Sequence, residues 1–99
     1  MQVLRTKEFV YWMSALRDRQ GRAKIIHRID RLEEGNPGKT RGVGAGVMEM
    51  KIDFGPGYRV YYIQRGGMLV VLLCGGDKST QAEDIQAAKK LAARLGEGD

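Results

Sequence analysis

Residues that could handle a phosphate group recur at alternate positions in two neighbouring stretches of the chain, around 47–54 and 58–64. Arginine and lysine bind phosphate oxygens, and a tyrosine can stack on a base or transfer a proton. Alternation with a period of two is typical of β-strands, and paired antiparallel strands would bring such side chains within about 5–8 Å of one another. We therefore predict one polar surface formed by Glu49, Lys51, Arg59, Tyr61, Lys78 and Gln81.

Lys78 and Gln81 are assigned to this surface because they follow the next predicted strand and lie near the start of the last predicted helix. The free N–H groups at a helix N-terminus favour a bound anion. An ordinary solvated sheet face, with its charges paired across the strands, would show the same alternation. The spacing alone leaves both interpretations open.

Two further reactive side chains are interpreted as structural. His27 lies in a predicted helix among basic residues and is predicted to be a surface residue. Cys74 ends the apolar run 68–74, where burial would keep its thiol protonated and unreactive. Neither has ligand partners at a usable spacing, so no metal site is predicted. The run 75–80 lacks the spacing of a phosphate-binding P-loop, and no cofactor is expected.

The charge of the chain favours an acidic or polyanionic partner. Lys and Arg number 17 and Asp and Glu number 12, which gives a formal net charge of +5 and a pI near 9.6. This balance suits nucleic acid, and the same charge would serve an acidic protein. We predict one domain over 1–95 and a disordered tail over 96–99. The sequence has no signal peptide and no apolar run of about 20 residues, so a soluble, cytoplasmic protein with no membrane partner is expected.

The first third of the chain is predicted to form a short strand over 1–5 and then two helices in a hairpin. Thr6 can cap the first helix, in which four apolar residues recur at helical spacing. The second helix ends at the Gly–Pro turn over 35–38. The predicted buried residues are Phe9, Trp12, Met13 and Leu16 in the first helix and Ala23, Ile25, Ile26, Ile29 and Leu32 in the second.

The rest of the chain is predicted to form a β-meander followed by a helix. The glycine-rich stretch 38–46 is interpreted as an extended, loosely held segment. Thr80 and Glu83 fit a capping box at the start of the last helix, which Gly96 would end. The whole is an α+β fold, in which the N-terminal helical hairpin and the C-terminal helix pack on one face of a small, mainly antiparallel sheet. Its strands, joined by tight glycine turns, are predicted over 47–54, 58–64 and 68–74.

Two motifs carry a family resemblance that extends over most of the chain. Residues 46–62 read G-V-M-E-M-K-I-D-F-G-P-G-Y-R-V-Y-Y and resemble the signature G-V-x-E-(L/M)-(R/K)-I-D-x-G-P-G-Y-R-V-Y-Y. Residues 72–81, followed by Asp84, Ile85 and Ala88, are similar to L-L-x-G-G-D-K-S-T-Q-x-x-D-I-x-x-A. Both signatures are those of the HigB-like addiction module killer proteins (phage-derived, Gp49-like) of the RelE/ParE toxin superfamily.

The resemblance implies the toxin of a type II toxin–antitoxin system with a microbial-RNase-like, RelE-like α+β fold. Such toxins are paired with a cognate antitoxin, often a helix-turn-helix DNA-binding protein. The HigB and RelE members are ribosome-dependent mRNA endoribonucleases, so messenger RNA and the ribosome are the implied further partners. Their cleavage needs no metal and no small-molecule cofactor, because the ribose 2′-OH attacks the adjacent phosphate with the help of basic side chains.

The same resemblance implies roles for particular residues. Arg59 corresponds to the phosphate-binding arginine of the family's G-Y-R motif, and Lys78 lies where related toxins place a basic catalytic residue. Gln81 and Asp84 fall on the part of the motif that enters the last helix, and these four are the implied catalytic residues. The residues implied to bind RNA are Lys51, Glu49 and Tyr61. Asp84 or Glu49 could serve as a general base if its surroundings raised its pKa.

Two other functions share this fold and remain open. A ParE-like toxin inhibits DNA gyrase through protein contacts and cuts no RNA. A non-enzymatic module would bind only an antitoxin and regulate transcription. Arg59 and Lys78 favour the endoribonuclease, because a pair of phosphate-binding residues has no evident use in binding gyrase.

Overall fold

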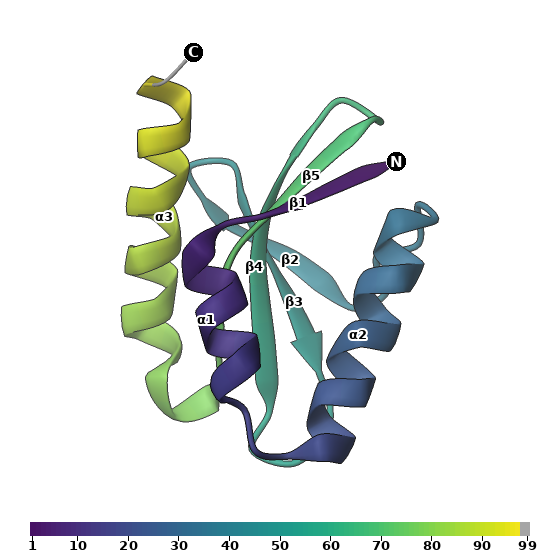
Figure 1. Ribbon diagram of the computed structural model, residues 1–99. Helices are drawn as coiled ribbons and strands as arrows, with labels where there is room; N and C mark the ends of the chain where they lie inside the picture. The colour runs from purple at the N-terminus through teal and green to yellow at the C-terminus, as the bar shows by residue number, and fades with distance from the viewer. Residues whose placement is uncertain (98–99) are drawn as a thin grey trace.

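The computed structural model describes residues 1–97, which form one five-stranded sheet and three α-helices (Figure 1). The sheet order is β1-β5-β4-β3-β2, in which β1 runs parallel to β5 and the other neighbours are antiparallel. The predicted α+β class and the mainly antiparallel sheet are therefore confirmed. The elements are β1 (Gln2–Arg5), α1 (Lys7–Ala15), α2 (Arg19–Glu33), β2 (Thr40–Gly44), β3 (Val47–Ile52), β4 (Tyr58–Arg65), β5 (Leu69–Gly76), the short 3-10 turn η1 (Lys78–Thr80) and α3 (Gln81–Glu97).

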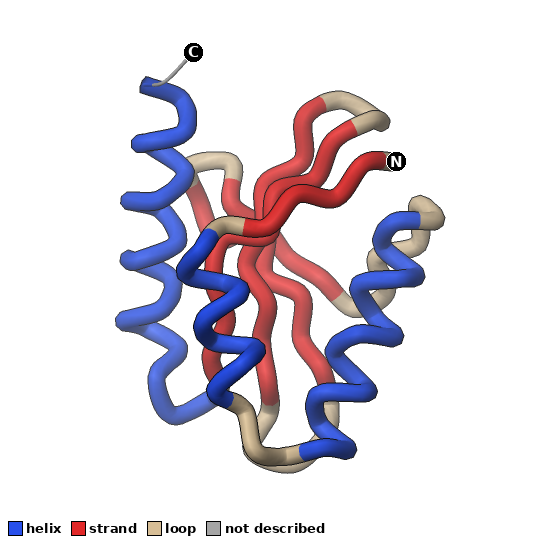
Figure 2. The backbone as a smooth tube through the Cα atoms, in the orientation of Figure 1, coloured by secondary structure: helices blue, strands red, loops and turns tan. Residues whose placement is uncertain are grey.

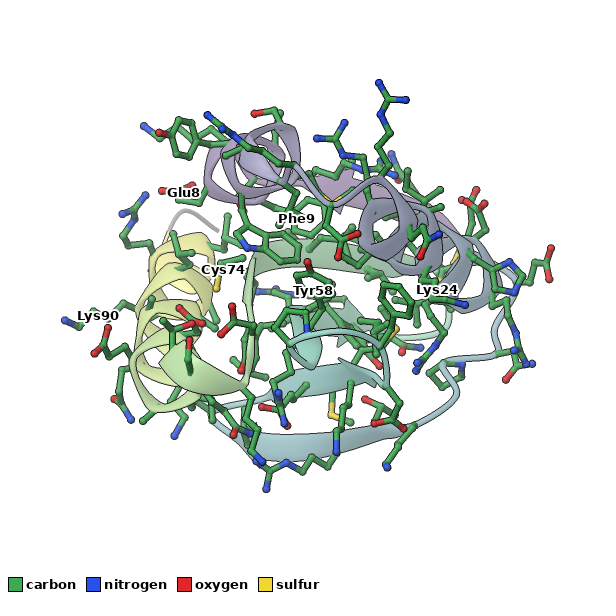
Figure 3. All side chains as sticks on the ribbon, turned by 90° about the horizontal axis from the view of Figure 1, so that it is seen from below. Glu8, Phe9, Lys24, Tyr58, Cys74 and Lys90 are labelled. Carbon is green, nitrogen blue, oxygen red and sulfur yellow. The ribbon has the colours of Figure 1, made fainter. Side chains whose placement is uncertain are left out.

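The helices lie on both faces of the sheet, so the predicted packing on one face is wrong. Figure 2 shows the strands between α2 and α3, with α1 in front of them, and the view from below again places the sheet between α2 and α3 (Figure 3). The apolar side chains of α1 pack in the same cluster as those of α2. Two separate apolar clusters occupy these two faces. The strands supply both clusters, because alternate residues point to opposite faces.

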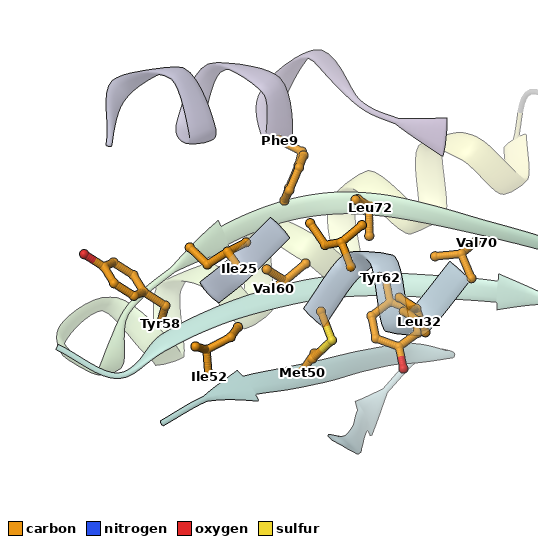
Figure 4. Close-up of a cluster of buried hydrophobic side chains, with 11 residues drawn as sticks. Phe9, Ile25, Leu32, Met50, Ile52, Tyr58, Val60, Tyr62, Val70 and Leu72 are labelled. Carbon is orange, nitrogen blue, oxygen red and sulfur yellow. The ribbon is translucent and has the colours of Figure 1, made fainter. Parts of the chain in front are cut away.

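The larger cluster lies under α1 and α2 (Figure 4). Phe9 from α1 and Ile25 from α2 meet Met50, Val60 and Leu72 from the three central strands, and all five are buried. The smaller cluster lies under α3, where its buried members are Val47, Tyr61, Ile63, Leu73, Ala88 and Leu91.

Side-chain caps fix the starts of α1 and α2. The Oγ1 atom of Thr6 accepts a hydrogen bond from the Phe9 N–H at 3.0 Å, as predicted, and donates to the Leu73 carbonyl at 2.6 Å. Asp18 caps α2 by accepting from the Gly21 N–H at 2.9 Å. The helix ends at Glu33, before Gly35 at φ +90°. The left-handed conformation there favours glycine.

Two residues of α2 that were predicted to be inward are exposed, Ala23 and Ile26. The buried face of α2 is narrower than predicted and consists of Gly21, Ile25, Ile29 and Leu32. Successive helical residues are separated by about 100°, so Ala23 and Ile26 fall outside a face centred on Ile25 and Ile29.

The glycine-rich stretch forms a strand where the sequence indicated a loosely held segment. β2 pairs antiparallel with β3, and Arg41 lies opposite Glu49. Between the two strands the chain turns through Gly44, Ala45 and Gly46, all of which have positive φ. Glycine lowers the cost of this turn, which is why a segment rich in glycine can still pair in the sheet.

The last helix starts and ends differently from the prediction. Asp77 caps η1 by accepting from the Ser79 N–H at 2.8 Å. A capping box between Thr80 and Glu83 was expected, but the Thr80 hydroxyl donates to Asp84 instead, at 2.5 Å. α3 continues through Gly96 to Glu97, so the predicted boundary at residue 96 lies within the helix. Residues 98–99 of the predicted tail lie outside the described residues. Among the described residues no helix is long and apolar enough to span a membrane.

Candidate functional site

Two adjoining hollows lie on the α3 face of the sheet, beyond the start of α3. They have volumes of about 360 and 340 Å³. Lys51 and Arg59 line both of them, so we treat the two as one feature and call it the basic groove. The remaining lining residues are Lys39, Thr40, Arg41, Glu49 and Gln81 in the first hollow and Asp53, Phe54, Gly55, Pro56, Gly57 and Lys78 in the second.

Arg59 stands at the centre of the basic groove and is only 5% exposed. One of its terminal nitrogens donates to the Gly57 carbonyl at 2.6 Å. Its Nε atom lies 3.9 Å from the Glu49 carboxylate and has no hydrogen-bond partner among the described residues. A buried N–H without a partner costs free energy, and an anion in the groove would satisfy it.

The glycine opposite Arg59 in the sheet explains how α3 can start so close to it. Arg59 pairs with Gly76, and a Cβ atom at Gly76 would lie 1.8 Å from the Asp84 carboxylate. Only glycine leaves room for the first turn of α3 to pack on the strand. Asp84, predicted to be catalytic, lines neither hollow. It sits over Gly76 and accepts from Thr80.

The surroundings of Asp84 nevertheless shift its protonation. Burial raises the pKa of Asp84, the hydrogen bond from Thr80 opposes that rise, and the negative charges of Asp77 and Glu83 add to it. A carboxyl group with a raised pKa could act as a general base or acid if it reached a substrate. Asp84 lines neither hollow, and its contacts with Thr80 and Gly76 hold the start of α3 against β5.

Glu49 is buried to 3% exposure, and both of its carboxylate oxygens are occupied. Oε1 accepts from Arg41 Nε at 2.8 Å, and Oε2 accepts from the Tyr61 hydroxyl at 3.0 Å and from Gln81 Nε2 at 2.9 Å. Burial alone would raise the pKa of Glu49, but these three hydrogen bonds and the Arg41 charge outweigh it and lower the pKa. The lowered pKa makes the carboxylate a weaker base than a free glutamate, whereas the predicted use as a general base required a raised pKa.

Tyr61 lies on the predicted face but is completely buried. Burial, the hydrogen bond to Glu49 and the charges of Glu49 and Asp84 raise the pKa of Tyr61. It has no surface to offer a base for stacking, so the predicted contact with RNA does not fit its position. Its hydroxyl holds Glu49, and its ring packs under α3.

The lysines of the basic groove are more accessible than Arg59. Lys51 lies opposite Arg59 in the sheet, and its Nζ atom is 3.4 Å from Asp53. Lys39 also pairs with Asp53, at 3.3 Å. Lys78 is exposed, and its backbone N–H donates to the Pro56 carbonyl at 3.3 Å, which fixes η1 against the Gly–Pro–Gly turn. With Arg41 and Arg59, these lysines outnumber the two carboxylates of the groove.

The sequence interpretation missed the contribution of β2, which brings Lys39, Thr40 and Arg41 to the basic groove. Thr40 donates from its hydroxyl to the Glu49 carbonyl at 3.0 Å, and Arg41 binds the Glu49 side chain. A signal for these residues exists in the sequence. The stretch 40–44 reads T-R-G-V-G, in which Arg41 and Val43 alternate with smaller residues, and its last glycine opens a Gly-Ala-Gly turn, as expected for a hairpin with the next strand.

The two side chains interpreted as structural lie away from the basic groove. His27 is exposed on α2. Cys74 is partly buried in the cluster under α3, and burial, with smaller effects from Asp84 and Glu8, raises the pKa of its thiol to about 12. The thiol is therefore protonated at neutral pH, as predicted. Residues 1–97 contain no cluster of three or more His, Cys, Asp or Glu side chains arranged to hold a metal ion.

Comparison with known proteins places the chain in a family. Residues 11–95 match the family described as "Phage derived protein Gp49-like (DUF891)". An uncharacterised protein of Haemophilus influenzae is 50% identical over 96 residues, which covers 97% of each chain. No solved structure matches the chain. On the strength of the family match and of this relative, the chain belongs to the phage-derived Gp49-like family, a toxin-like family.

Proposed function

We propose that this protein is the toxin of a type II toxin–antitoxin pair and that it cleaves messenger RNA in the basic groove. The observation that carries the proposal is the buried Arg59 guanidinium, whose Nε atom has no hydrogen-bond partner among the described residues and which lines both hollows beside Lys51. A guanidinium held in this way is suited to binding a phosphate. Membership of a toxin-like family supports the same conclusion and implies an antitoxin as partner.

The reaction that suits the groove is an internal transfer at an RNA phosphodiester. The 2′ oxygen bonds to phosphorus and gives its proton to solvent water, while the bond from phosphorus to the 5′ oxygen breaks and that oxygen takes a proton from solvent water. The products carry a 2′,3′-cyclic phosphate and a 5′-hydroxyl. The negative charge that develops on the phosphate oxygens in the transition state is what Arg59 would stabilise.

The other groove residues divide into those that would meet the substrate and those that would position them. Lys51 and Lys78 are accessible beside Arg59 and would bind the phosphate and the leaving oxygen. Glu49, Tyr61 and Gln81 would hold one another in position, since their hydrogen bonds fix the floor of the first hollow. Gln81, proposed from the sequence as catalytic, is in this arrangement a positioning residue.

The test is to express the chain from a tightly controlled promoter and to map RNA 5′ ends after induction. We expect new ends inside translated messages, and we expect Arg59→Lys and Lys78→Ala each to reduce them by about a hundredfold. Lys90→Ala, which removes an exposed lysine from α3, is the matched control and should cleave normally. Thermal unfolding of each variant would verify that the fold is retained.

The same experiment separates the proposal from the alternatives. Growth arrest without new ends would point to another target, such as gyrase, and would refute the endoribonuclease. No growth arrest at all would leave a module that binds an antitoxin. New ends that appear equally with Arg59→Lys and Lys78→Ala would move the cleavage site away from the basic groove.

A further inference from the structure

The outer surface of α2 carries one exposed isoleucine between a basic and an acidic half. Ile26 is 45% exposed and, with the half-exposed Val10 of α1, forms an exposed apolar pair on this side of the molecule. Arg22 and Asp30 lie four residues before and after it, and Arg19 and Glu33 lie seven residues before and after it. Residues at these spacings share one face of a helix. We call these five residues the α2 stripe.

Beside the stripe, a groove of about 430 Å³ separates α1 from α2. Its apolar wall and floor include Val10 and Met13 from α1 and Ile26 and Ile29 from α2. Val10 is half exposed, like Ile26. Arg22 and Asp30 also line the groove, and they are separated along the helix by about 12 Å. Arg5 lines it as well, so the apolar middle of the groove is bordered by two arginines and one carboxylate.

The order of charges along the stripe is unfavourable within a single helix. The N-terminal end of a helix favours negative side chains and the C-terminal end favours positive ones. On the α2 stripe the arginines, Arg19 and Arg22, come first, and the carboxylates, Asp30 and Glu33, come last. Arg22 has a role within its own chain, because its guanidinium donates to the Leu16 carbonyl at the end of α1. Intrahelical electrostatics do not explain the order of Arg19, Asp30 and Glu33. A second helix of the same sequence running in the opposite direction does, because each basic end then meets an acidic end.

We propose that the groove between α1 and α2 is occupied by a second copy of this chain, with the two α2 helices antiparallel across a two-fold axis near Ile26. Ile26 of each copy enters the groove of the other beside Val10 and Met13. Arg22 then lies opposite Asp30 of the other copy, and Arg19 lies opposite Glu33. Each contact occurs twice, as a closed two-fold interface requires. Because α2 and the basic groove lie on opposite faces of the sheet, the dimer leaves the basic groove open.

The interface is built mainly from one helix pair and a shallow groove, and it lies at the small end of specific interfaces. We therefore expect a reversible dimer with a dissociation constant of about micromolar order. Sedimentation equilibrium of the full chain over a wide range of concentrations would measure it. A chain that stays monomeric at every concentration would overturn the proposal.

Charge reversal identifies the surface used. Arg19→Glu and Glu33→Arg each place like charges opposite one another twice in the dimer, and each should weaken it by about three- to tenfold. The double variant Arg19→Glu/Glu33→Arg restores opposite charges and should dimerise like the original chain. An equimolar mixture of the two single variants should form a mixed dimer more tightly than either variant alone. Both positions are exposed, so neither change should affect folding of the monomer.

Two further variants complete the test. Ile26→Asp should abolish the dimer, whereas Lys90→Glu, an equal change of charge on the exposed side of α3, should leave it intact. If the single reversals do not weaken the dimer, or if the double variant fails to restore it, the copies associate through another surface and the assignment to α2 is wrong. None of these results depends on RNA cleavage or on an antitoxin.

Discussion

On the α1–α2 face of the sheet, apolar side chains continue along β3 from Met48 through Met50 to Ile52, and helices cover all of them. On the α3 face, the same strand begins with Val47 under the helix, continues with Glu49 and ends with Lys51 in the basic groove. The change occurs where α3 begins, because Gln81, its first residue, binds Glu49. β3 thus contributes to a buried apolar core on one face of the sheet and to the basic groove on the other. The start of the covering helix determines where the core stops.

The comparison also shows two ways of stabilising a carboxylate, one partly exposed and one buried. Asp18 lies at the edge of the α1–α2 cluster and accepts from the Gly21 N–H and, at 2.8 Å, from the Tyr58 hydroxyl. Those two hydrogen bonds, Gly21 first, lower the pKa of Asp18 against the effect of burial. Glu49 lies deeper and depends on three separate elements, β2, β4 and α3. A change at Glu49 should therefore disturb the site as a whole, whereas a change at Asp18 should affect one helix start.

The largest expected effect comes from a substitution in the apolar cluster on the α1–α2 face. Phe9→Ala removes a buried ring from the α1–α2 cluster and should lower the free energy of unfolding by about 3–5 kcal/mol. Tyr11→Ala removes a ring of similar size from the same helix, but Tyr11 is 76% exposed and its loss should cost less than about 1 kcal/mol. Urea unfolding of the two variants measures the difference. Equal losses would mean that α1 does not pack as described.

The second effect tests β5, which contributes side chains to both apolar clusters. A Cβ atom at Gly75 would lie 2.4 Å from the Trp12 ring, which contacts Phe9 and Tyr58 and cannot move freely. Gly75→Ala should therefore lower the free energy of unfolding by about 2–3 kcal/mol. Gly67→Ala is the matched control, because no atom lies within 4 Å of the added group. A cost for Gly75→Ala as small as that for Gly67→Ala would contradict the close approach of α1 to β5.

The third effect belongs to the α3 face and depends on pH. Glu49→Gln removes the charge to which Arg41, Gln81 and Tyr61 donate, and it should cost about 2 kcal/mol at neutral pH. Because folding lowers the pKa of Glu49 below its ordinary value of 4.5, its stabilisation is present above that value and is lost as the pH falls through the folded pKa. The original chain should lose stability with acidification below about pH 4.5, and Glu49→Gln should lose less.

Urea unfolding at a series of pH values would measure this effect. Glu83→Gln, at an exposed position of α3, should keep the pH dependence of the original chain. If Glu49→Gln retained that dependence in full, Glu49 would not be the ionised centre of the network.

The smallest expected effect comes from removing the Tyr58 hydroxyl while its ring is kept. Tyr58→Phe keeps the contact with Trp12 and removes only the hydroxyl that donates to Asp18, so it should cost about 1 kcal/mol. Burial and Asp18 raise the pKa of Tyr58 to about 12, and the hydroxyl therefore remains a donor throughout the neutral range. Tyr11→Phe, on the exposed surface, should cost nothing measurable. Reduced RNA cleavage by Tyr58→Phe at full stability would show that the hydroxyl has a role in the basic groove.

Much of the fold could be predicted from the sequence because caps, alternation and turn glycines depend only on neighbouring residues. The cap at Thr6, the alternation over 47–54 and the glycines at 55–57 all act within a few residues, and each predicted element is present. Apart from the start of α2, which lies three residues earlier than expected, the ends agree within about two residues. The predicted position of α3 was wrong because the residues of a helix do not determine which face of a sheet the helix will cover. β2 was missed because its glycines lower the apparent strand propensity, although pairing with β3 decides the outcome.

The candidate site was predicted in part. Alternation placed Glu49, Lys51, Arg59 and Tyr61 on one face, and the register confirms that these pairs lie opposite one another. Alternation could not reveal that α3 would bury Tyr61 or that Glu49 would be enclosed by hydrogen bonds, because burial depends on a helix that starts about 30 residues later. The place of Asp84 above Gly76 likewise depends on tertiary packing.

The pairing of β1 with β5 has a consequence for the order in which the chain is made. The first strand finds its partner only when residues 69–76 have been synthesised, and the basic groove also needs Gln81. Contacts so far apart in sequence form late during folding. A nascent chain still attached to the ribosome that makes it would therefore lack an assembled groove until its final helix had emerged. With the proposed cleavage of messenger RNA in that groove, this order would keep each molecule from acting on the message that is encoding it.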